Sequence, residues 1–394
     1  MIINDKRALA HIQLVHDIRP IEGADNIELV HVLGWTLIAK KGEFQEGDKA
    51  VYIEIDSQVP SNDERFAFLV SKHYKIKTYK LNKFGVISQG LALPLYSFPE
   101  LGNAEVNTDV TEALHITYAV AEDRTRKAHV DIWASLRQRR PDLFKKWWFR
   151  ILLKHRWGHW IIDKIWGKKA LKETAFPSEY CSKTDEERVQ NMPYILEDKS
   201  PYVVTEKIDG TSSTYVLVNH AKPGKAPKYE FIVSSRNVRQ LSPDQACYHD
   251  DNVYWEMAIK YDLENKMKAM MEQLPEAKYI VLQGETYGEN LQGNKYKMDY
   301  RDIKFFNFID SYRGKWDTET AAAFIKGFKL DWVPIVSREY ILPDTIEEML
   351  DAATGPSMIN PEVLREGWVI RRETPNGIIS FKAVSPEFLI RNKE

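Results

Sequence analysis

One lysine of this sequence lies at a position where its amine could act as a nucleophile. It is Lys207, within residues 203–215, which read V-V-T-E-K-I-D-G-T-S-S-T-Y. β-Branched residues on both sides of Lys-Ile-Asp-Gly predict a strand, a turn and a second strand. Flanking strands fix the backbone at such a junction, so the Lys207 amine could face a cleft and act as a nucleophile. The same pattern also fits a β-hairpin whose lysine is solvated and whose Asp-Gly pair makes the turn.

The carboxyl-terminal half carries further charged and aromatic groups on predicted strands. These strands are residues 231–235 followed by Arg236, residues 279–282 leading into Glu285, residues 302–310 with Phe306 and Phe308, residues 366–371 beginning at Glu366, and residues 378–384 with Lys382. Strand alternation predicts that Phe306 and Phe308 share one face. Lys382 lies in mid-strand between Phe381 and Ala383, so its charge needs a partner.

The amino-terminal region must fold as a separate element. Short β segments separated by turns run through residues 8–95, and they fall at residues 12–18, 27–32, 35–39, 50–55, 75–80 and 90–93. This spacing suits an OB-type barrel. Its lysines and one tyrosine could form the basic face with which such barrels hold nucleic acid, or a solvated strand edge that blocks aggregation. They are Lys40, Lys41, Lys72, Tyr74, Lys75, Lys77 and Lys80.

The order of the motifs resembles a known enzyme superfamily. Lys-Ile-Asp-Gly, Ser-Arg-Asn, Gly-Glu-x-x-Gly, Phe-Phe-x-Phe, Glu-Gly-x-Val and Phe-Lys follow one another as in the covalent nucleotidyltransferases, which are ATP-dependent DNA and RNA ligases and mRNA capping enzymes. The run K-T-D-E-E-R-V-Q-N at residues 183–191 resembles RNA ligases in particular, although on its own Thr184 to Glu187 favours a helix start. An OB module at the amino-terminal end is similar to the Deinococcus-type RNA ligase. The resemblance covers residues 8–95 and 176–394.

This resemblance implies a chemistry for each motif. Lys207 would attack the α-phosphorus of ATP and hold AMP as a phosphoramidate, with Mg²⁺ or Mn²⁺ as the cofactor. Glu285 and Glu366 would organise the metal, and Asp209 would assist through water. Lys382 would contact the α-phosphate.

The resemblance also implies which residues bind the nucleotide and the incoming end. Arg236 would contact the ribose or the phosphate of the incoming 5′ end. Phe306 or Phe308 would stack on adenine, with Lys183 near the base. Glu206, Ile208 and Trp368, which adjoin these motifs, complete the predicted nucleotide-binding set.

Two departures from the family pattern leave assignments open. Many relatives carry a second lysine two positions before the one assigned to Lys382, and here Ser380 stands there. Pyrophosphate contacts would then fall to Arg371, Arg372 or another residue. The Ile-Asp pair after Phe308 also differs from the Phe-Asp of some relatives, so either phenylalanine could be the stacking one.

A basic, tryptophan-rich segment lies outside the resemblance. From residue 123 to residue 172 the sequence carries many Lys and Arg with few acids and six Trp, with helical spacing broken at Pro141 and near Gly158. Three interpretations stay open: a clamp on a nucleic-acid backbone, a helix on a membrane surface, or a connecting helical layer.

Composition limits the class of protein. A 43% hydrophobic and 12% aromatic content excludes a disordered chain, and a net charge of -2 means that any basic surface is local. Cys181 and Cys247 lie far apart without metal-ligand spacing, which suits a reducing compartment. Charged residues near the amino terminus argue against a signal peptide, and no apolar run spans a bilayer. We therefore expect a cytoplasmic protein without a transmembrane segment.

Together these features predict an α+β protein that ligates RNA with ATP. We expect an OB-fold domain at residues 1–110, a helical basic insert at 111–175 and an antiparallel-sheet nucleotidyltransferase domain at 176–394. Only residues 383–394 follow Lys382, too few for the OB domain that DNA ligases and capping enzymes place there. The expected partner is RNA or an RNA-containing nicked duplex, bound by a monomer. Alternatives are another covalent nucleotidyltransferase, of DNA ligase or capping type, or a non-catalytic nucleic-acid-binding protein on a ligase fold.

Overall fold

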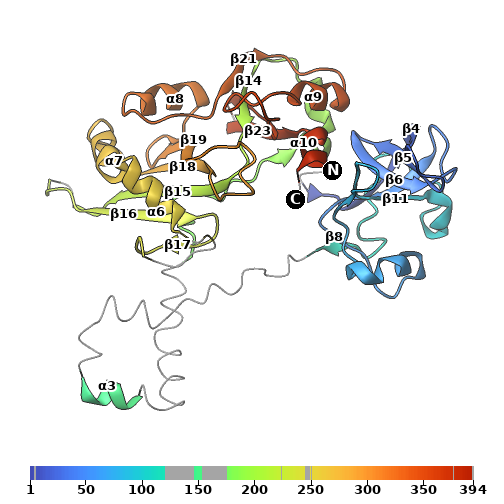
Figure 1. The fold of residues 1–394 in the computed structure, drawn as a ribbon, viewed down its shortest axis with the longest axis horizontal. Helices are drawn as coiled ribbons and strands as arrows, with labels where there is room; N and C mark the ends of the chain where they lie inside the picture. Colours follow the sequence, from blue (N-terminus) through green and yellow to red (C-terminus); the bar gives the residue numbers. More distant parts are fainter. Residues whose placement is uncertain are drawn as a thin grey trace. The chain divides into compact units, whose positions relative to one another are not determined.

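The computed structural model describes most of the chain (Figure 1). The described residues are 1–3, 6–119, 146–152, 175–222, 224–244, 249, 251–375 and 377–392. The chain forms two compact units: Met1–Ala121, Glu186–Lys207 and Pro334–Glu394 make the first, and Glu122–Asp185 and Ile208–Val333 make the second. Of the predicted insert at 111–175, the structure describes residues 111–119, 146–152 and 175, and the one helix among them is α3 (Trp147–Leu152). The interpretations of the insert, including the breaks at Pro141 and Gly158, therefore stay open.

The amino-terminal part of the first unit is a small β structure, as predicted. One sheet has the order β11-β7-β3 and another the order β4-β5-β6. Their bounds are β3 (Ala10–Leu14), β4 (His16–Pro20), β5 (Ile27–Val32), β6 (Trp35–Lys40), β7 (Lys49–Ile53) and β11 (Leu91–Pro94). Short ladders pair β1 (Ile2–Ile3) with β2 (Lys6–Arg7), β8 (Ser57–Gln58) with β12 (Thr117–Tyr118), and β9 (Thr78–Leu81) with β10 (Val86–Gln89). The strand expected at residues 75–80 thus begins later, at Thr78.

Alternating apolar residues explain why these strands close around a core. Val30 and Val32 of β5 are buried, and they pack in one cluster with Trp35 and Leu37 of β6. A second cluster lies around Phe66 of the 3₁₀ helix η1 (Glu64–Lys72). Shorter 3₁₀ helices follow at η2 (Leu95–Ser97) and η3 (Pro99–Leu101). Burial of one face of each strand drives the barrel together.

The rest of the first unit is a five-stranded sheet. Its order is β13-β23-β22-β14-β21, and all neighbours except the parallel β13–β23 pair are antiparallel. The strands are β13 (Glu187–Arg188), β14 (Tyr202–Lys207), β21 (Ile335–Tyr340), β22 (Gly367–Thr374) and β23 (Gly377–Val384). The helices beside them are η5 (Val189–Asn191), η6 (Pro193–Glu197), α9 (Ile346–Ala353) and α10 (Pro386–Arg391). Met349 and Leu350 of α9 pack with Tyr202, Ile370 and Phe381, so α9 covers one face of this sheet.

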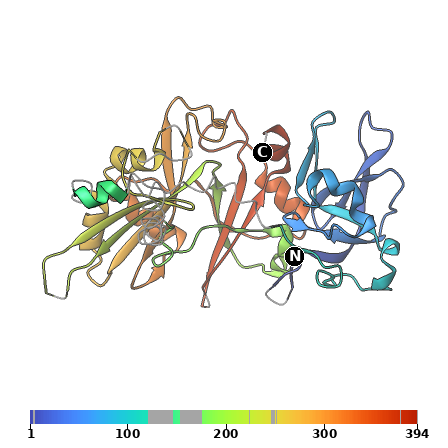
Figure 2. The same ribbon diagram turned by 90° about the horizontal axis from the view of Figure 1, so that it is seen from below.

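The second unit is an antiparallel sheet of six strands covered by helices on one face. The order is β17-β16-β15-β18-β19-β20, with β15 (Thr211–Asn219), β16 (Tyr229–Ser235), β17 (Arg239–Gln240), β18 (Tyr279–Gly288), β19 (Arg301–Asp310) and β20 (Gly314–Lys315). Helices α6 (Val253–Lys260), α7 (Leu263–Glu272) and α8 (Thr318–Lys326) share one core cluster with Leu282 and Phe305 of the sheet. Figure 2 shows the yellow α6 and α7 against the strands. Among the described residues, no helix has the length and apolar character needed to cross a membrane.

A bulge in β19 changes which phenylalanine faces this core. Asn307 pairs with Gln283, but Phe305 pairs with Gly284, so Phe306 is the extra residue between them. Phe305 and Phe308 are fully buried in the core cluster, whereas Phe306 is partly exposed. The prediction that Phe306 and Phe308 share one face is therefore wrong, because the bulge interrupts the alternation on which it relied.

We expect Phe308→Ala to destabilise the protein by about 3–5 kcal/mol, because it removes a ring that packs against Trp316 and Phe324. Phe306→Ala is the matched control and should cost less than about 1 kcal/mol, because its ring is outside the core. Urea unfolding of both variants, followed by circular dichroism, measures the difference. Equal losses would contradict the assignment of the two faces.

Candidate active site

Lys207 is the last residue of β14 and pairs with Gly367 of β22. Its Nζ lies 2.6 Å from Oε2 of Glu366, and the side chains of Lys207 and Glu366 are 26% and 9% exposed. A Cβ on Gly367 would lie 2.1 Å from the carbonyl oxygen of Ala383, so only glycine lets β22 approach β23 this closely. The Glu-Gly pair thus holds a carboxylate against the lysine amine at the strand ends.

The strand register places further cations on the face that carries Lys207. Residues directly opposite each other in an antiparallel pair point to the same face, and the face alternates along each strand. Counting from the Lys207–Gly367 pair, Val369 and Arg371 share its face. Lys382 lies opposite Val369, and Ser380 lies opposite Arg371. One face therefore carries Lys207, Lys382 and Arg371.

Arg371 is held in place by two contacts across this face. Its Nε donates to Oγ of Ser380 at 3.1 Å, and its Nη2 lies 2.8 Å from Oε1 of Glu186. The Arg371 side chain is 8% exposed. Its guanidinium thus lies beside Ser380, the position where a second lysine was expected, while neighbouring Arg372 points to the other face, over the ring of Tyr202.

Glu206 and Trp368 also lie on the opposite face, away from Lys207. Glu206 is 1% exposed, and its carboxylate accepts hydrogen bonds from Oγ of Ser357 at 2.5 Å and from the N–H of Met358 at 2.7 Å. Burial raises the pKa of Glu206. Trp368 is buried in the core and makes an edge contact with the ring of Tyr340. The strand alternation points both residues into the core, and their role in nucleotide binding stays a prediction.

In the second unit, the turn after Lys207 packs closely against the strand of Glu285. Glu285 pairs with Ser212 of β15 and with Lys304 of β19. A Cβ on Gly210 would lie 2.3 Å from the carbonyl oxygen of Thr286 and 3.1 Å from Cγ of Glu285. Glycine is therefore required at this point of the Lys-Ile-Asp-Gly motif. Ile208, predicted to bind nucleotide, is buried.

Two residues that the sequence analysis missed hold Asp209. Nζ of Lys295 lies 2.5 Å from Oδ2 of Asp209, and the backbone N–H of Asp209 donates to the hydroxyl of Tyr296 at 2.9 Å. The loop that carries them is fixed by Asn294, whose side chain bonds to both the N–H and the carbonyl of Met298. This loop has no periodic sequence pattern, so its contact with Asp209 could not be predicted from the sequence.

Lys183 and Arg236 lie on neighbouring segments of the second unit. Nζ of Lys183 donates to Oδ1 of Asn237 at 2.8 Å, and Arg236 pairs with Asp185 at 2.9 Å. The helix start expected at Thr184 is wrong, because residues 181–186 are irregular and Glu187 begins the strand β13. The structure thus brings Asp185 to Arg236, and in the first unit it brings Glu186 to Arg371.

Amide side chains fix the segment that bears Lys183 over the sheet of the second unit. Nε2 of Gln283 donates to the carbonyl of Ser182 at 3.0 Å, and Nδ2 of Asn307 donates to Oε1 of Gln283 at 2.9 Å. The neighbouring Cys181 is buried, and this burial raises the pKa of its thiol to about 12. Cys181 is therefore an inert core thiol, as its lack of metal-ligand spacing indicated.

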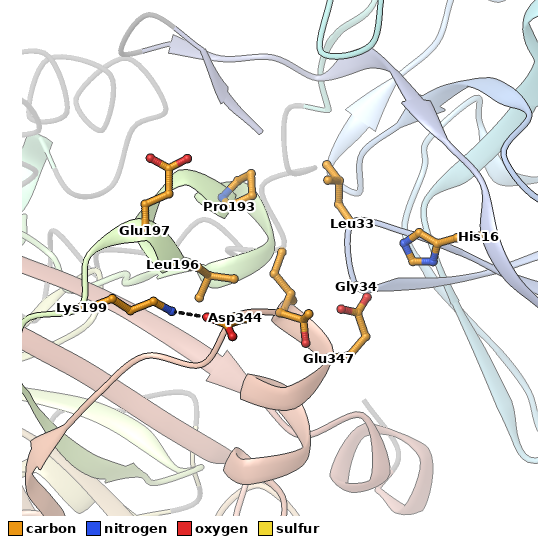
Figure 3. Close-up of a pocket in the computed structure, with 11 residues that line it drawn as sticks. His16, Leu33, Gly34, Pro193, Leu196, Glu197, Lys199, Asp344 and Glu347 are labelled. Atoms are coloured by element: carbon orange, nitrogen blue, oxygen red, sulfur yellow. Dashed lines mark hydrogen bonds and ion pairs between the residues drawn. The ribbon is translucent and has the colours of Figure 1, made fainter.

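The first unit also contains a cavity of about 510 Å³, which is separate from the predicted site residues (Figure 3). It is lined by residues that include His16, Gly34, Lys199, Asp344 and Glu347. Lys199 donates there to Oδ1 of Asp344 at 2.7 Å. None of the predicted site residues lines this cavity. Within the described part of the chain, no cluster of three or more His, Cys, Asp or Glu could hold a metal ion.

Comparison with known proteins identifies relatives over nearly the whole length. A family model described as RNA ligase matches residues 200–384, and one described as an OB-fold domain matches residues 9–95. No curated protein matches. A solved structure of a mutant Naegleria gruberi RNA ligase with AMP and Mn is 30% identical, with 98% of this chain and 99% of that chain covered and a TM-score of 0.62. Another mutant of the same enzyme with ATP and Mn is 29% identical (98% and 100% covered, TM-score 0.63), and the enzyme with PPi is 29% identical (98% and 99% covered, TM-score 0.61).

We expect Glu206→Ala to lower the free energy of unfolding by about 1–3 kcal/mol, because it leaves the buried Ser357 hydroxyl and the Met358 N–H without their acceptor. Glu206→Gln keeps one acceptor oxygen and should cost less. Chemical denaturation of the two variants measures the difference. A Glu206→Ala protein of wild-type stability would contradict a structural role for this carboxylate.

Proposed function

The chain belongs to the RNA ligase family and is an ATP-dependent RNA ligase, and on this basis we propose that it joins RNA ends through AMP held on Lys207. The observation that carries this proposal is the Lys207 amine at 2.6 Å from Glu366, on a sheet face that also carries Lys382 and Arg371. Family membership also decides against the DNA ligase, capping and non-catalytic alternatives.

The proposed reaction has three steps. The neutral Lys207 amine attacks the α-phosphorus of ATP, so that an N–P bond forms and the bond to pyrophosphate breaks. The AMP then passes to the 5′-phosphate of an RNA end, which frees the lysine. Finally a 3′-hydroxyl attacks that phosphate, forms the phosphodiester and releases AMP.

Lys207 must lose a proton before it can attack. With an ordinary lysine pKa of about 10.4, deprotonation at pH 7 costs about 4.6 kcal/mol. Glu366 favours the charged amine when the two are paired, so the carboxylate must be engaged elsewhere at the moment of attack. Its position just before the start of β22 orients the amine until then.

Two carboxylates are enough to hold a divalent cation whose other ligands are water molecules and phosphate oxygens of the substrate. Mg²⁺ is commonly bound by one or two carboxylates together with waters and substrate phosphates, so the absence of a three-residue cluster in the described residues is compatible with it. Glu285 and Glu366 are the proposed ligands. A cation bound there, such as the manganese in the similar ligase structures, would supply positive charge that favours a neutral Lys207 and offsets the charge of the phosphates.

The remaining residues position the nucleotide in this proposal. Lys382 stabilises the charge that develops on the α-phosphate. Arg371 takes the pyrophosphate contact, because it shares the face of Lys207 while Arg372 does not. Phe306 is the proposed stacking residue for adenine, since Phe308 belongs to the core.

The proposal for the second unit extends to three more side chains. Lys183 lies near the base, and Arg236 contacts the ribose or the incoming 5′ end. Asp209 assists through water in the position set by Lys295 and Tyr296. We propose a nicked RNA-containing duplex as the substrate in RNA repair; the monomeric state, the cytoplasmic location and the domain bounds 1–110, 111–175 and 176–394 stay predictions.

We expect wild-type protein incubated with ATP and magnesium to gain the mass of one AMP, about 329 Da, because the nucleotide stays bound to the lysine. Lys207→Ala should show no gain. Intact mass spectrometry, after any preloaded nucleotide has been stripped, measures both. An equal gain in mass in the variant would place the AMP on another residue and would contradict the proposed role of Lys207.

We expect Arg371→Ala to slow formation of the AMP adduct about tenfold or more, because it removes a positive charge from the face where pyrophosphate would depart. Arg372→Ala is the matched control: it removes the same charge from the opposite face and should leave the rate per folded molecule near that of wild type. Rapid-quench measurement of the adduct, with unfolding curves to correct for lost stability, compares the two. Similar rates in both variants would rule out a specific role for Arg371.

A further inference from the structure

One stretch of the amino-terminal barrel differs in charge from the rest of the molecule. Residues 65–99 contain no Asp or Glu but carry five lysines, whereas the whole chain has a net charge of -2. The lysines are Lys72, Lys75, Lys77, Lys80 and Lys83. Arg65, at the start of the stretch, is neutralised by Asp63 and Glu100, each at 2.6 Å. The excess positive charge therefore lies on the lysines that follow.

An exposed aromatic ring contacts one of these lysines. Nζ of Lys72, the last residue of η1, lies 4.9 Å from the ring centroid of Tyr79 in β9. Tyr79 is 47% exposed, and Phe68 of η1 is 58% exposed. Lys77, just before β9, is exposed as well. We call Phe68, Lys72, Lys77 and Tyr79 the basic strip.

The backbone beneath the basic strip is fixed. His73 and Tyr74 both adopt left-handed conformations, with φ of 54° and 59°, and they end η1 sharply. The N–H of Ile76 donates to the carbonyl of Ser57 at 2.8 Å, and the carbonyl of Tyr74 accepts from Val59 at 2.9 Å. These bonds tie the segment to the barrel, so binding does not have to order its backbone.

Four other members of the predicted basic face are engaged differently. Nζ of Lys80 donates to the carbonyl of Ile390, and Tyr74 packs partly into the barrel core. Lys40 and Lys41 sit in a turn beside two carboxylates: Glu43 accepts from the N–H of Lys40, and Glu28 from the N–H of Gly42. Lys72 and Lys77 thus combine exposure with a stretch of sequence that lacks acids, and Lys72 also contacts the ring of Tyr79.

We propose that the basic strip binds an unpaired stretch of the substrate RNA outside the nicked duplex part. Lys72 and Lys77 contact phosphates, and Phe68 and Tyr79 offer flat surfaces on which bases stack. Charge complementarity favours a polyanion, and exposed rings beside lysines favour one that carries bases. This inference rests on the proposed ligase function and adds to it a surface for the RNA away from Lys207 in the sequence.

The test measures how salt weakens RNA binding to the full chain. A labelled single-stranded oligoribonucleotide is titrated by fluorescence anisotropy at a series of salt concentrations. The Lys72→Ala/Lys77→Ala variant should bind more weakly and show a slope of log K against log salt that is shallower by about 1.4, because each phosphate contact contributes about 0.7 on a single strand. Phe68→Ala/Tyr79→Ala should weaken binding about fivefold or more with the slope unchanged, because stacking releases no counterions.

The Lys40→Ala/Lys41→Ala variant removes the same charge and serves as the control. Its slope should equal that of wild type. A wild-type slope in the Lys72/Lys77 variant would overturn the inference and leave the surface to a protein partner. An equal change in the two lysine variants would also overturn it, because bulk charge would then explain both.

Intact mass of the AMP adduct, measured on the same preparations, separates this inference from the proposed chemistry. Adduct formation does not need RNA, so it should be unchanged in every variant of the basic strip. An adduct in all variants with a shallower slope only in the Lys72/Lys77 variant supports the inference. A lack of adduct in wild type would refute the chemistry at Lys207, while the salt slopes would still decide whether the basic strip binds RNA.

Discussion

The antiparallel register of β14, β22 and β23 is the constraint on which the candidate site depends. Because Lys207 lies opposite Gly367, the two-residue alternation assigns every other side chain of these strands to one of two faces. Lys382 and Arg371 fall on the face of Lys207, and the apolar residues of the other face are buried against α9. A slip by one residue would exchange core and active site, so packing of the apolar face also fixes the chemistry.

The motifs of the site could be predicted from sequence because each is short and local. Lys-Ile-Asp-Gly occupies a strand end and turn, as expected, and Glu366 stands at the start of β22 beside Lys207. Glu206 and Trp368 were assigned to the site because they adjoin motif residues in the chain. Adjacent residues on a strand point to opposite faces, so proximity in sequence was a poor guide to proximity in space.

Two kinds of feature could not be predicted from the sequence. They are contacts between distant segments of the chain and interruptions of the strand alternation. Arg371 and Glu186 are separated by 185 residues, and the pair of Asp209 with Lys295 joins a turn to an irregular loop. The bulge that turns Phe306 away from the core depends on the partner strand β18, not on the residues of β19 alone. Such features follow from tertiary packing, which a local pattern does not encode.

The cations of this protein divide into two kinds by their partners. Lys207 and Arg371 each contact a carboxylate, which holds a side chain in one geometry, as a reacting group requires. Lys72 and Lys77 lie in a stretch without acids, where no carboxylate near them in the sequence can neutralise their charge. Charge of this second kind suits a long polyanion, because each phosphate contact adds affinity through counterion release and demands little geometric precision. A near-neutral chain can thus hold both a precise catalytic face and a local surface for RNA, and only the distribution of its acids distinguishes them.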